Sequence, residues 1–148
     1  MKLGASTQLL QKLIGFASVF PDDDGIVEFL VSYLHDLGFT CNVVEGSTCR
    51  NIYAELGAEN GAGKTLAFAG HFDVVPSGDL GLWSVDPFVG EIVGGKVIGR
   101  GAVDMKGGIA AFMAATKLYL AEHGVPKGKL CFLLTGDEEV NSVGIQDL

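Results

Sequence analysis

Three short segments of the chain combine histidine and carboxylate side chains that could bind a metal ion or move a proton. His71 and Asp73 follow a short apolar run, Asp104 lies among the glycines of "GRGAVDMKGG", and Glu138 and Glu139 end the run "TGDEE". One histidine with several carboxylates and no thiolate is a ligand set suited to Zn²⁺, Mn²⁺ or Co²⁺. The three adjacent carboxylates of "TGDEE" repel one another, so either exposure to water or a bound cation must reduce this repulsion.

The spacing within each segment indicates what each side chain could do. Residues two apart in an extended segment point to the same side, so Asp73 can accept the ring N–H of His71 and leave the other nitrogen for a metal. At an irregular strand end, one of the adjacent acids Glu138 and Glu139 can bind a cation while the other acts as a general base. Taken alone, the His–Asp pair is more often structural, and Asp104 could equally cap the helix that follows it.

A different segment, residues 58–65, nearly spells a phosphate-binding loop that ends in Gly63, Lys64 and Thr65. Such a loop must open a helix, so that backbone N–H groups and the helix dipole meet the phosphates. Residues 66–69 are a continuous apolar run typical of a strand. We therefore predict an exposed turn between two strands instead of a nucleotide site.

The elements that must position these residues follow from hydrophobic periodicity. We predict one helix that Ser6 or Thr7 caps and that ends by Pro21, and a second helix that begins at the acids 22–24 and ends before Gly38. Residues 39–44 and 51–56 alternate as a strand pair, and residues 89–93 and 96–98 flank Gly94-Gly95 as a hairpin.

Two further strands deliver the candidate site. Residues 66–69 and 130–134 are apolar runs of the kind buried in an α/β sheet, and each precedes one of the candidate segments. An alanine-rich helix is predicted over residues 105–123, and residues 141–148 look like the start of another helix capped by Ser142. Ligand groups in α/β folds gather at the carboxyl ends of strands, which is where these side chains fall.

Composition narrows the class of protein. The chain has 148 residues, 48% of them hydrophobic, and a mean hydropathy of +0.36, which favour an ordered α/β domain. A formal charge of -8 argues against nucleic acid or an anionic membrane as partner. Cys41, Cys49 and Cys131 lack a C-x-x-C spacing, so we expect neither disulfides nor a thiolate zinc site, and a cytoplasmic location fits best. No signal peptide or membrane helix is expected.

Four motifs in order, "AGHFDVVP", "GDLGLWSVDPF", "GRGAVDMKGG" and "LLTGDEE", resemble those of the M20 family of dinuclear zinc amidohydrolases and peptidases. The resemblance covers residues 9–144. It implies an α/β, three-layer, zinc-exopeptidase-like catalytic domain with a mixed central sheet flanked by helices, of which residues 1–148 form the N-terminal part. The lid or dimerisation domain and the C-terminal part of the catalytic domain are expected to be absent.

The resemblance also implies roles for the candidate residues. His71 is implied as a ligand of one zinc, Glu139 as a ligand of the second, and Asp104 as the carboxylate that bridges both ions. Co²⁺ or Mn²⁺ could substitute for Zn²⁺. Glu138 is implied as the general base that takes a proton from the attacking water and returns it to the leaving amine, and Asp73 as the carboxylate that supports His71.

The implied activity is metal-dependent hydrolysis of an N-acyl amino-acid amide, with N-succinyl-LL-2,6-diaminopimelate of lysine biosynthesis as the first substrate expectation. Acetylornithine deacetylases and carboxypeptidases of the same family share these motifs, so their activities are alternatives. An alternative from another functional class is a non-catalytic metal-binding or dimer-forming fragment. Partners are then a small-molecule N-acyl amino acid and a second copy of the full-length protein. Asp137 receives no role from the resemblance and stays unassigned.

Overall fold

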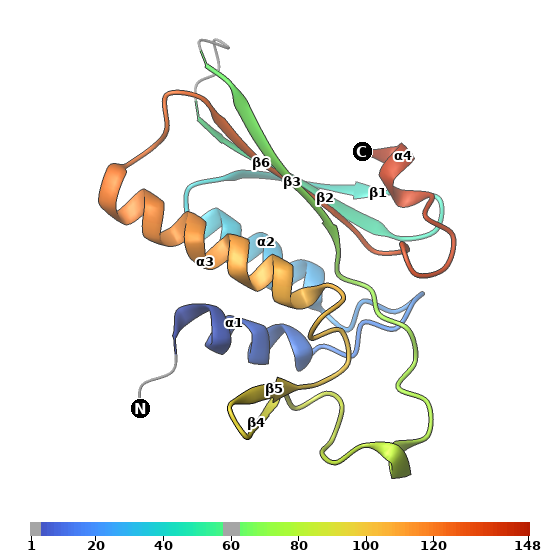
Figure 1. Ribbon diagram of the computed structural model, residues 1–148. Helices are drawn as coiled ribbons and strands as arrows, with labels where there is room; N and C mark the ends of the chain where they lie inside the picture. The colour runs from blue at the N-terminus through green and yellow to red at the C-terminus, as the bar shows by residue number, and fades with distance from the viewer. Residues whose placement is uncertain (1–3, 58–62) are drawn as a thin grey trace.

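The computed structural model describes residues 4–57 and 63–148. The fold consists of helices, a main sheet and a separate two-stranded hairpin (Figure 1). The elements in order are α1 (Ala5–Ile14), α2 (Ile26–Asp36), β1 (Thr40–Glu45), β2 (Arg50–Gly57), β3 (Thr65–His71), the 3-10 turn η1 (Leu80–Leu82), β4 (Glu91–Val93), β5 (Lys96–Ile98), α3 (Lys106–His123), β6 (Lys129–Thr135) and α4 (Gly144–Asp147).

The main sheet has four strands in the order β1-β2-β6-β3. β1 pairs antiparallel with β2, and β2 pairs antiparallel with β6. β3 runs parallel to β6, with His71 opposite Thr135, so the carboxyl ends of these two strands lie side by side. The sheet is therefore mixed, as expected from the family resemblance.

Helices flank this sheet. α2 and α3 cover one face, α1 packs against α3, and α4 lies near the other face at the ends of β2 and β6 (Figure 1). Alternate strand residues such as Ile52, Ala54 and Phe132 point toward α2 and α3 and are fully buried, because side chains of a strand alternate between the two faces. The predicted mixed α/β fold is confirmed.

The predicted strand pair, the hairpin and the long helix are all present. β1 and β2 pair within one residue of the predicted bounds, and β4 begins two residues later than predicted. β4 and β5 join through Gly94 and Gly95, whose φ angles of 58° and 80° suit a tight hairpin turn. α3 matches the predicted helix. β3 begins at Thr65, so residues 66–69 form a strand, which excludes the helix that a phosphate loop needs; residues 58–62 of the predicted turn lie outside the described residues.

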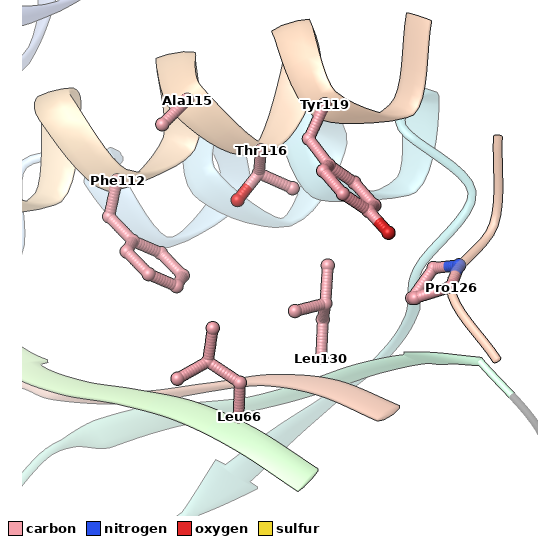
Figure 2. A pocket seen from close by; sticks show the side chains of 7 residues that line it. All are labelled: Leu66, Phe112, Ala115, Thr116, Tyr119, Pro126 and Leu130. Atoms are coloured by element: carbon pink, nitrogen blue, oxygen red, sulfur yellow. The ribbon is translucent and has the colours of Figure 1, made fainter. Parts of the chain in front are cut away.

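The prediction that residues 66–69 form a buried strand is wrong. Within the described chain β3 is an edge strand that pairs with β6 alone, and the side chain of Leu66 is 56% exposed. Beside this edge, α3 and the sheet enclose an apolar groove of about 320 Å³ (Figure 2). It is lined by Leu66, Phe112, Ala115, Thr116, Tyr119, Pro126 and Leu130. The apolar run at residues 66–69 thus correctly predicted a strand. It did not predict how far the strand is buried, because burial depends on neighbouring elements.

The first two helices differ from the prediction at their ends. α1 begins after Gly4 without a side-chain cap and ends at Ile14, well before Pro21. The chain leaves the helix there because Ser18 and Val19 lie beside the segment after β3, with Val19 in a parallel bridge to Val74. α2 begins at Ile26, after the three acids instead of at them.

Two of those acids, Asp23 and Asp24, accept hydrogen bonds from other parts of the chain. The Arg50 guanidinium donates to Asp23 and also to Glu28, in the first turn of α2. The backbone N–H of Ala17 donates to Asp24. These bonds connect the start of α2 to β2 and to the segment that follows α1.

At the carboxyl end, α4 starts after Val143, and the predicted Ser142 cap is wrong because the Ser142 hydroxyl donates to the carbonyl of Glu138. The three cysteine thiols are free, as expected. Among the described residues no helix is long and apolar enough to span a membrane.

Candidate metal centre

The candidate residues come from three segments of the chain that meet at the carboxyl ends of β3 and β6. His71 ends β3, and Asp73 follows it at the start of the next loop. Glu138 and Glu139 follow the end of β6, which is paired in register with β3. Asp104 comes from the turn that precedes α3. The parallel pairing of β3 and β6 therefore explains why residues nearly 70 positions apart share one site.

His71 is buried and has defined contacts on both ring nitrogens. Its Nδ1 lies 3.1 Å from the carbonyl of Asp73 and 3.5 Å from that residue's carboxylate. Its Nε2 lies 3.0 Å from Asp104 Oδ1 and 3.7 Å from Glu138 Oε2. A hydrogen bond from Nδ1 to a carbonyl leaves Nε2 as the ligand atom, so Nε2 points to where the acids gather. The predicted contact with Asp73 exists, but its carbonyl is nearer than its carboxylate.

The buried carboxylate of Asp73 does more than the sequence suggested. Its Oδ1 accepts the backbone N–H of Glu138 at 3.1 Å, and its Oδ2 accepts that of Glu139 at 3.0 Å. One side chain thus fixes the backbone of both candidate acids as well as lying beside His71. Sequence spacing could not reveal this contact, since it depends on the pairing of distant strands.

The segment around His71 is held from the amino-terminal part of the chain. The Ser18 hydroxyl donates to the carbonyl of Phe72 at 2.6 Å, and the backbone N–H of Val74 donates to the carbonyl of Ser18. Phe72 itself is buried in the hydrophobic core. The backbone on both sides of Asp73 is therefore fixed by hydrogen bonds and by packing.

His71, Asp104 and Glu139 form a compact group that could hold a metal ion. One ligand atom from each lies within 4.8 Å of the others. Zn²⁺ binds nitrogen and carboxylate oxygen at about 2.0–2.2 Å, so atoms this close can serve one ion, or two ions that share a carboxylate. The donor set and its spacing fit the metal that the sequence predicts, and the roles of these residues as ligands stay predictions.

The electrostatics of the group favour a cation. Burial lowers the pKa of His71, but hydrogen bonds to the carboxylates of Asp73 and Asp104 outweigh it and raise that pKa to about 9. Burial is the main cause that raises the pKa of Glu139; the charge of His71 opposes this shift, and the charges of Asp104 and Glu138 add to it. The raised pKa of His71 thus reflects negative charge around the ring that a metal ion would neutralise.

The group is open to solvent on one side. Asp104 and Glu138 have side chains that are 75% and 53% exposed, in contrast to the buried His71 and Asp73. They line a hollow of about 470 Å³ together with residues of β3, the α3 turn and α4. A small molecule could therefore reach the acids from solvent while their supports stay buried.

The turn that carries Asp104 depends on glycine. Asp104 does not cap α3, since the N-cap position is Met105 and has no side-chain cap bond. Gly101 has a φ of 75°, a left-handed value that favours glycine, and a side chain on Gly107 would collide with the carbonyl of Ala102. These glycines let the turn fold closely onto α3.

A buried lysine beneath this turn was missed from the sequence. Lys106, the first residue of α3, is fully buried, and its ammonium donates to the carbonyl of Phe16 at 2.7 Å. Burial lowers the pKa of Lys106 to about 8, and the charges of Asp24 and Asp73 oppose that shift. The lysine thus ties the start of α3 to the segment that follows α1.

The fold and the ligand group define an α/β domain with a candidate metal centre at one edge of its sheet. The profile of "Peptidase family M20/M25/M40" matches residues 67–148, which include every candidate residue. The chain belongs to this family.

Similar proteins agree with this assignment. A protein of Rhodospirillum centenum named succinyl-diaminopimelate desuccinylase is 49% identical over 88% of this chain and 34% of its own length. Human carnosine dipeptidase 1 has a similar structure, with a TM-score of 0.81 and 29% identity over 96% of this chain and 34% of its own. An M20 family metallo-carboxypeptidase from Sulfolobus solfataricus has a TM-score of 0.80 and 26% identity, over 93% of this chain and 32% of its own. The chain spans about a third of the length of the curated relatives it matches.

Proposed function

We propose that the complete product of the gene that encodes this chain, called the full-length protein below, hydrolyses N-succinyl-LL-2,6-diaminopimelate to succinate and LL-2,6-diaminopimelate, a step of lysine biosynthesis. Residues 1–148 are the N-terminal part of its catalytic domain in this proposal. The observation that carries the proposal is the convergence of His71, Asp104 and Glu139 within 4.8 Å, beside Glu138. The relatives named as desuccinylases support the choice of substrate.

Three residues would hold the metal in this proposal. His71 would bind through Nε2, Glu139 through its carboxylate, and Asp104 would be shared between two Zn²⁺ ions, with Co²⁺ or Mn²⁺ as substitutes. Bound zinc would supply Lewis-acid polarisation of the amide carbonyl. Asp104 is well placed for a shared ligand because it is the most exposed acid of the group and lies 3.0 Å from His71 Nε2.

Glu138 would move the proton. Its carboxylate is about half exposed and lies 3.7 Å from His71 Nε2, next to the ligand group. It accepts a proton from the attacking water as the C–O bond forms, and gives that proton to the nitrogen as the C–N bond breaks. Asp73 holds the backbone of Glu138 and Glu139 in a fixed relation while this occurs.

A substrate panel tests the proposal. The full-length protein, loaded with Zn²⁺, is assayed with N-succinyl-LL-2,6-diaminopimelate, N-acetylornithine and a dipeptide, each with and without a chelator. We expect chelator-sensitive hydrolysis with the succinyl compound preferred. Preferred hydrolysis of one of the other compounds would mean that this compound, and not the succinyl compound, is the substrate. Metal binding without any hydrolysis would favour a non-catalytic metal-binding protein.

Residues 1–148 alone form a second arm of the test. We expect this chain to bind zinc weakly and to hydrolyse the succinyl substrate far more slowly than the full-length protein. The described residues offer three clustered ligands for two ions, whereas a catalytic zinc usually has three protein ligands of its own. Equal turnover by the short chain would contradict this expectation.

A further inference from the structure

Asp137, the first acid of "TGDEE", is fully buried and makes hydrogen bonds in three directions. Its Oδ2 accepts the hydroxyl of Thr48 at 2.7 Å and the backbone N–H of Val143 at 3.1 Å, and its Oδ1 accepts the N–H of Gly144 at 2.9 Å. Its backbone carbonyl accepts the N–H groups of Val140, Asn141 and Ser142. Both the side chain and the backbone of Asp137 therefore organise the turn that follows it.

These bonds join parts of the chain that are otherwise separate. Thr48 lies in the loop between β1 and β2, 89 residues before Asp137, and Val143 and Gly144 begin α4. Glu138 and Glu139 stand between the two sets of bonds. Asp73 accepts their backbone N–H groups, and Asp137, the residue just before them, accepts those of residues 140–144 just after them.

The packing around Asp137 leaves little room for another arrangement. A side chain on Gly144 would approach Asp137 Oδ1 to 2.7 Å and would also collide with the side chain of Asn51. Asn51 is itself fully buried, and its Oδ1 accepts the backbone N–H of Gly136 at 3.3 Å. A buried polar atom that loses its partner is costly, so a change at Asp137 is expected to shift the turn instead of being absorbed locally.

We propose that Asp137 and its partner Thr48 are positioning residues for the reaction, and that through them the β1–β2 loop sets the placement of Glu138 and Glu139. This inference rests on the proposed function for its kinetic consequences. Neither residue belongs to the ligand group, and both act through the turn. A displacement of about 1 Å in a reacting group can cost about 100-fold in rate, which sets the scale of the expected effect.

The test compares variants of the full-length protein. Asp137→Asn keeps one acceptor oxygen but places an amide where two donors now point, and we expect kcat to fall about 10- to 100-fold with KM changed far less. Thr48→Val removes one hydroxyl donor and is expected to lower kcat less, and Thr48→Ser is expected to restore it. Asp79→Asn is the matched control, since Asp79 caps η1 through Gly81 and is exposed.

Hydrogen exchange of the zinc-free protein gives a readout that does not depend on activity. We expect Asp137→Asn and Thr48→Val to speed exchange in residues 136–144, with Thr48→Ser and Asp79→Asn unchanged. If Asp137→Asn does not fold, the exchange and kinetics of Thr48→Val test the proposal. Unchanged exchange in residues 136–144 would overturn the proposal, and so would a fall in melting temperature with kcat retained. A wild-type protein without hydrolytic activity would refute the proposed function, while the exchange data would still test the positioning role.

Discussion

The two ends of β3 differ sharply in how their neighbours hold them. At the carboxyl end, His71 is buried and is surrounded by polar groups whose backbone is fixed by hydrogen bonds. At the amino end and along the outer edge, Leu66 is 56% exposed beside the apolar groove shown in Figure 2. The described chain thus holds the residues of the candidate metal centre in place, but it leaves the outer side of β3 unpaired.

This difference separates two kinds of mutational effect. Changes at the carboxyl end should alter metal binding and proton transfer, because exact placement matters there and the supports are buried. Changes along the open edge should have small effects, because exposed apolar side chains contribute little to the free energy of unfolding. Residues of the core between these regions should affect the free energy of unfolding alone.

The largest effect is expected for Glu138→Ala in the full-length protein. Loss of a general base should lower kcat by about 10² to 10⁴ while zinc content stays near that of the wild type, since Glu138 is not placed among the ligands. Asp104→Ala should lower both turnover and zinc content. The measurement is metal analysis of the purified variants beside their kinetics, and equal loss of zinc in the two would show that the acids have been assigned wrongly.

Phe132→Ala tests the core beneath the site. The ring of Phe132 is fully buried in β6 and contacts the rings of Phe39, Phe68 and Phe112. Its removal should lower the free energy of unfolding by about 3–5 kcal/mol, as for other buried phenylalanines. Val93→Ala in the exposed β4 is the control in denaturant titrations, and a similar loss for both variants would contradict the assigned core.

The affinity for zinc should fall as the pH is lowered. The pKa of His71 is raised to about 9 in the metal-free protein, so the ring is protonated at neutral pH and must lose that proton to bind a metal. The apparent affinity should therefore drop about tenfold for each pH unit below 9 when one proton is displaced. Competition with a coloured chelator measures it, with His123→Gln as the control; an affinity independent of pH would exclude His71 as a ligand.

The smallest effect is expected for Leu66→Ala at the open edge. Because Leu66 is 56% exposed, its truncation should change the free energy of unfolding of residues 1–148 by less than about 1 kcal/mol. A loss comparable to that of Phe132→Ala would mean that the groove is not open in solution. Leu134→Ala, at a fully buried position on the neighbouring strand, is the matched comparison.

Local patterns predicted the elements well, since alternation and apolar runs reflect which face of a strand or helix is buried. They failed where burial depends on neighbours. Residues 66–69 are as apolar as a central strand, yet within the described chain β3 has a partner on one side alone. Helix ends were also misplaced, because the chain after α1 turns away to pair with Val74.

The candidate site was predictable in its residue types but not in its supports. The spacing and the family motifs predicted four of its residues: His71, Asp104, Glu138 and Glu139. The supporting roles of Lys106 and Asp137 could not be predicted in this way, since Lys106 bonds Phe16, 90 residues away, Asp137 bonds Thr48, 89 residues away, and a buried charge has no local signature. The sequence also left open whether Asp104 caps a helix; in the structure the N-cap position of α3 is Met105, and no side chain caps it.

The most direct test of the central claim is anomalous diffraction at the zinc edge from crystals of the full-length protein. We predict one zinc about 2.0–2.2 Å from His71 Nε2 and a second zinc bound by Glu139, with Asp104 shared by both ions and Glu138 outside the coordination sphere. Zinc bound away from these residues, or bound directly by Glu138, would contradict it.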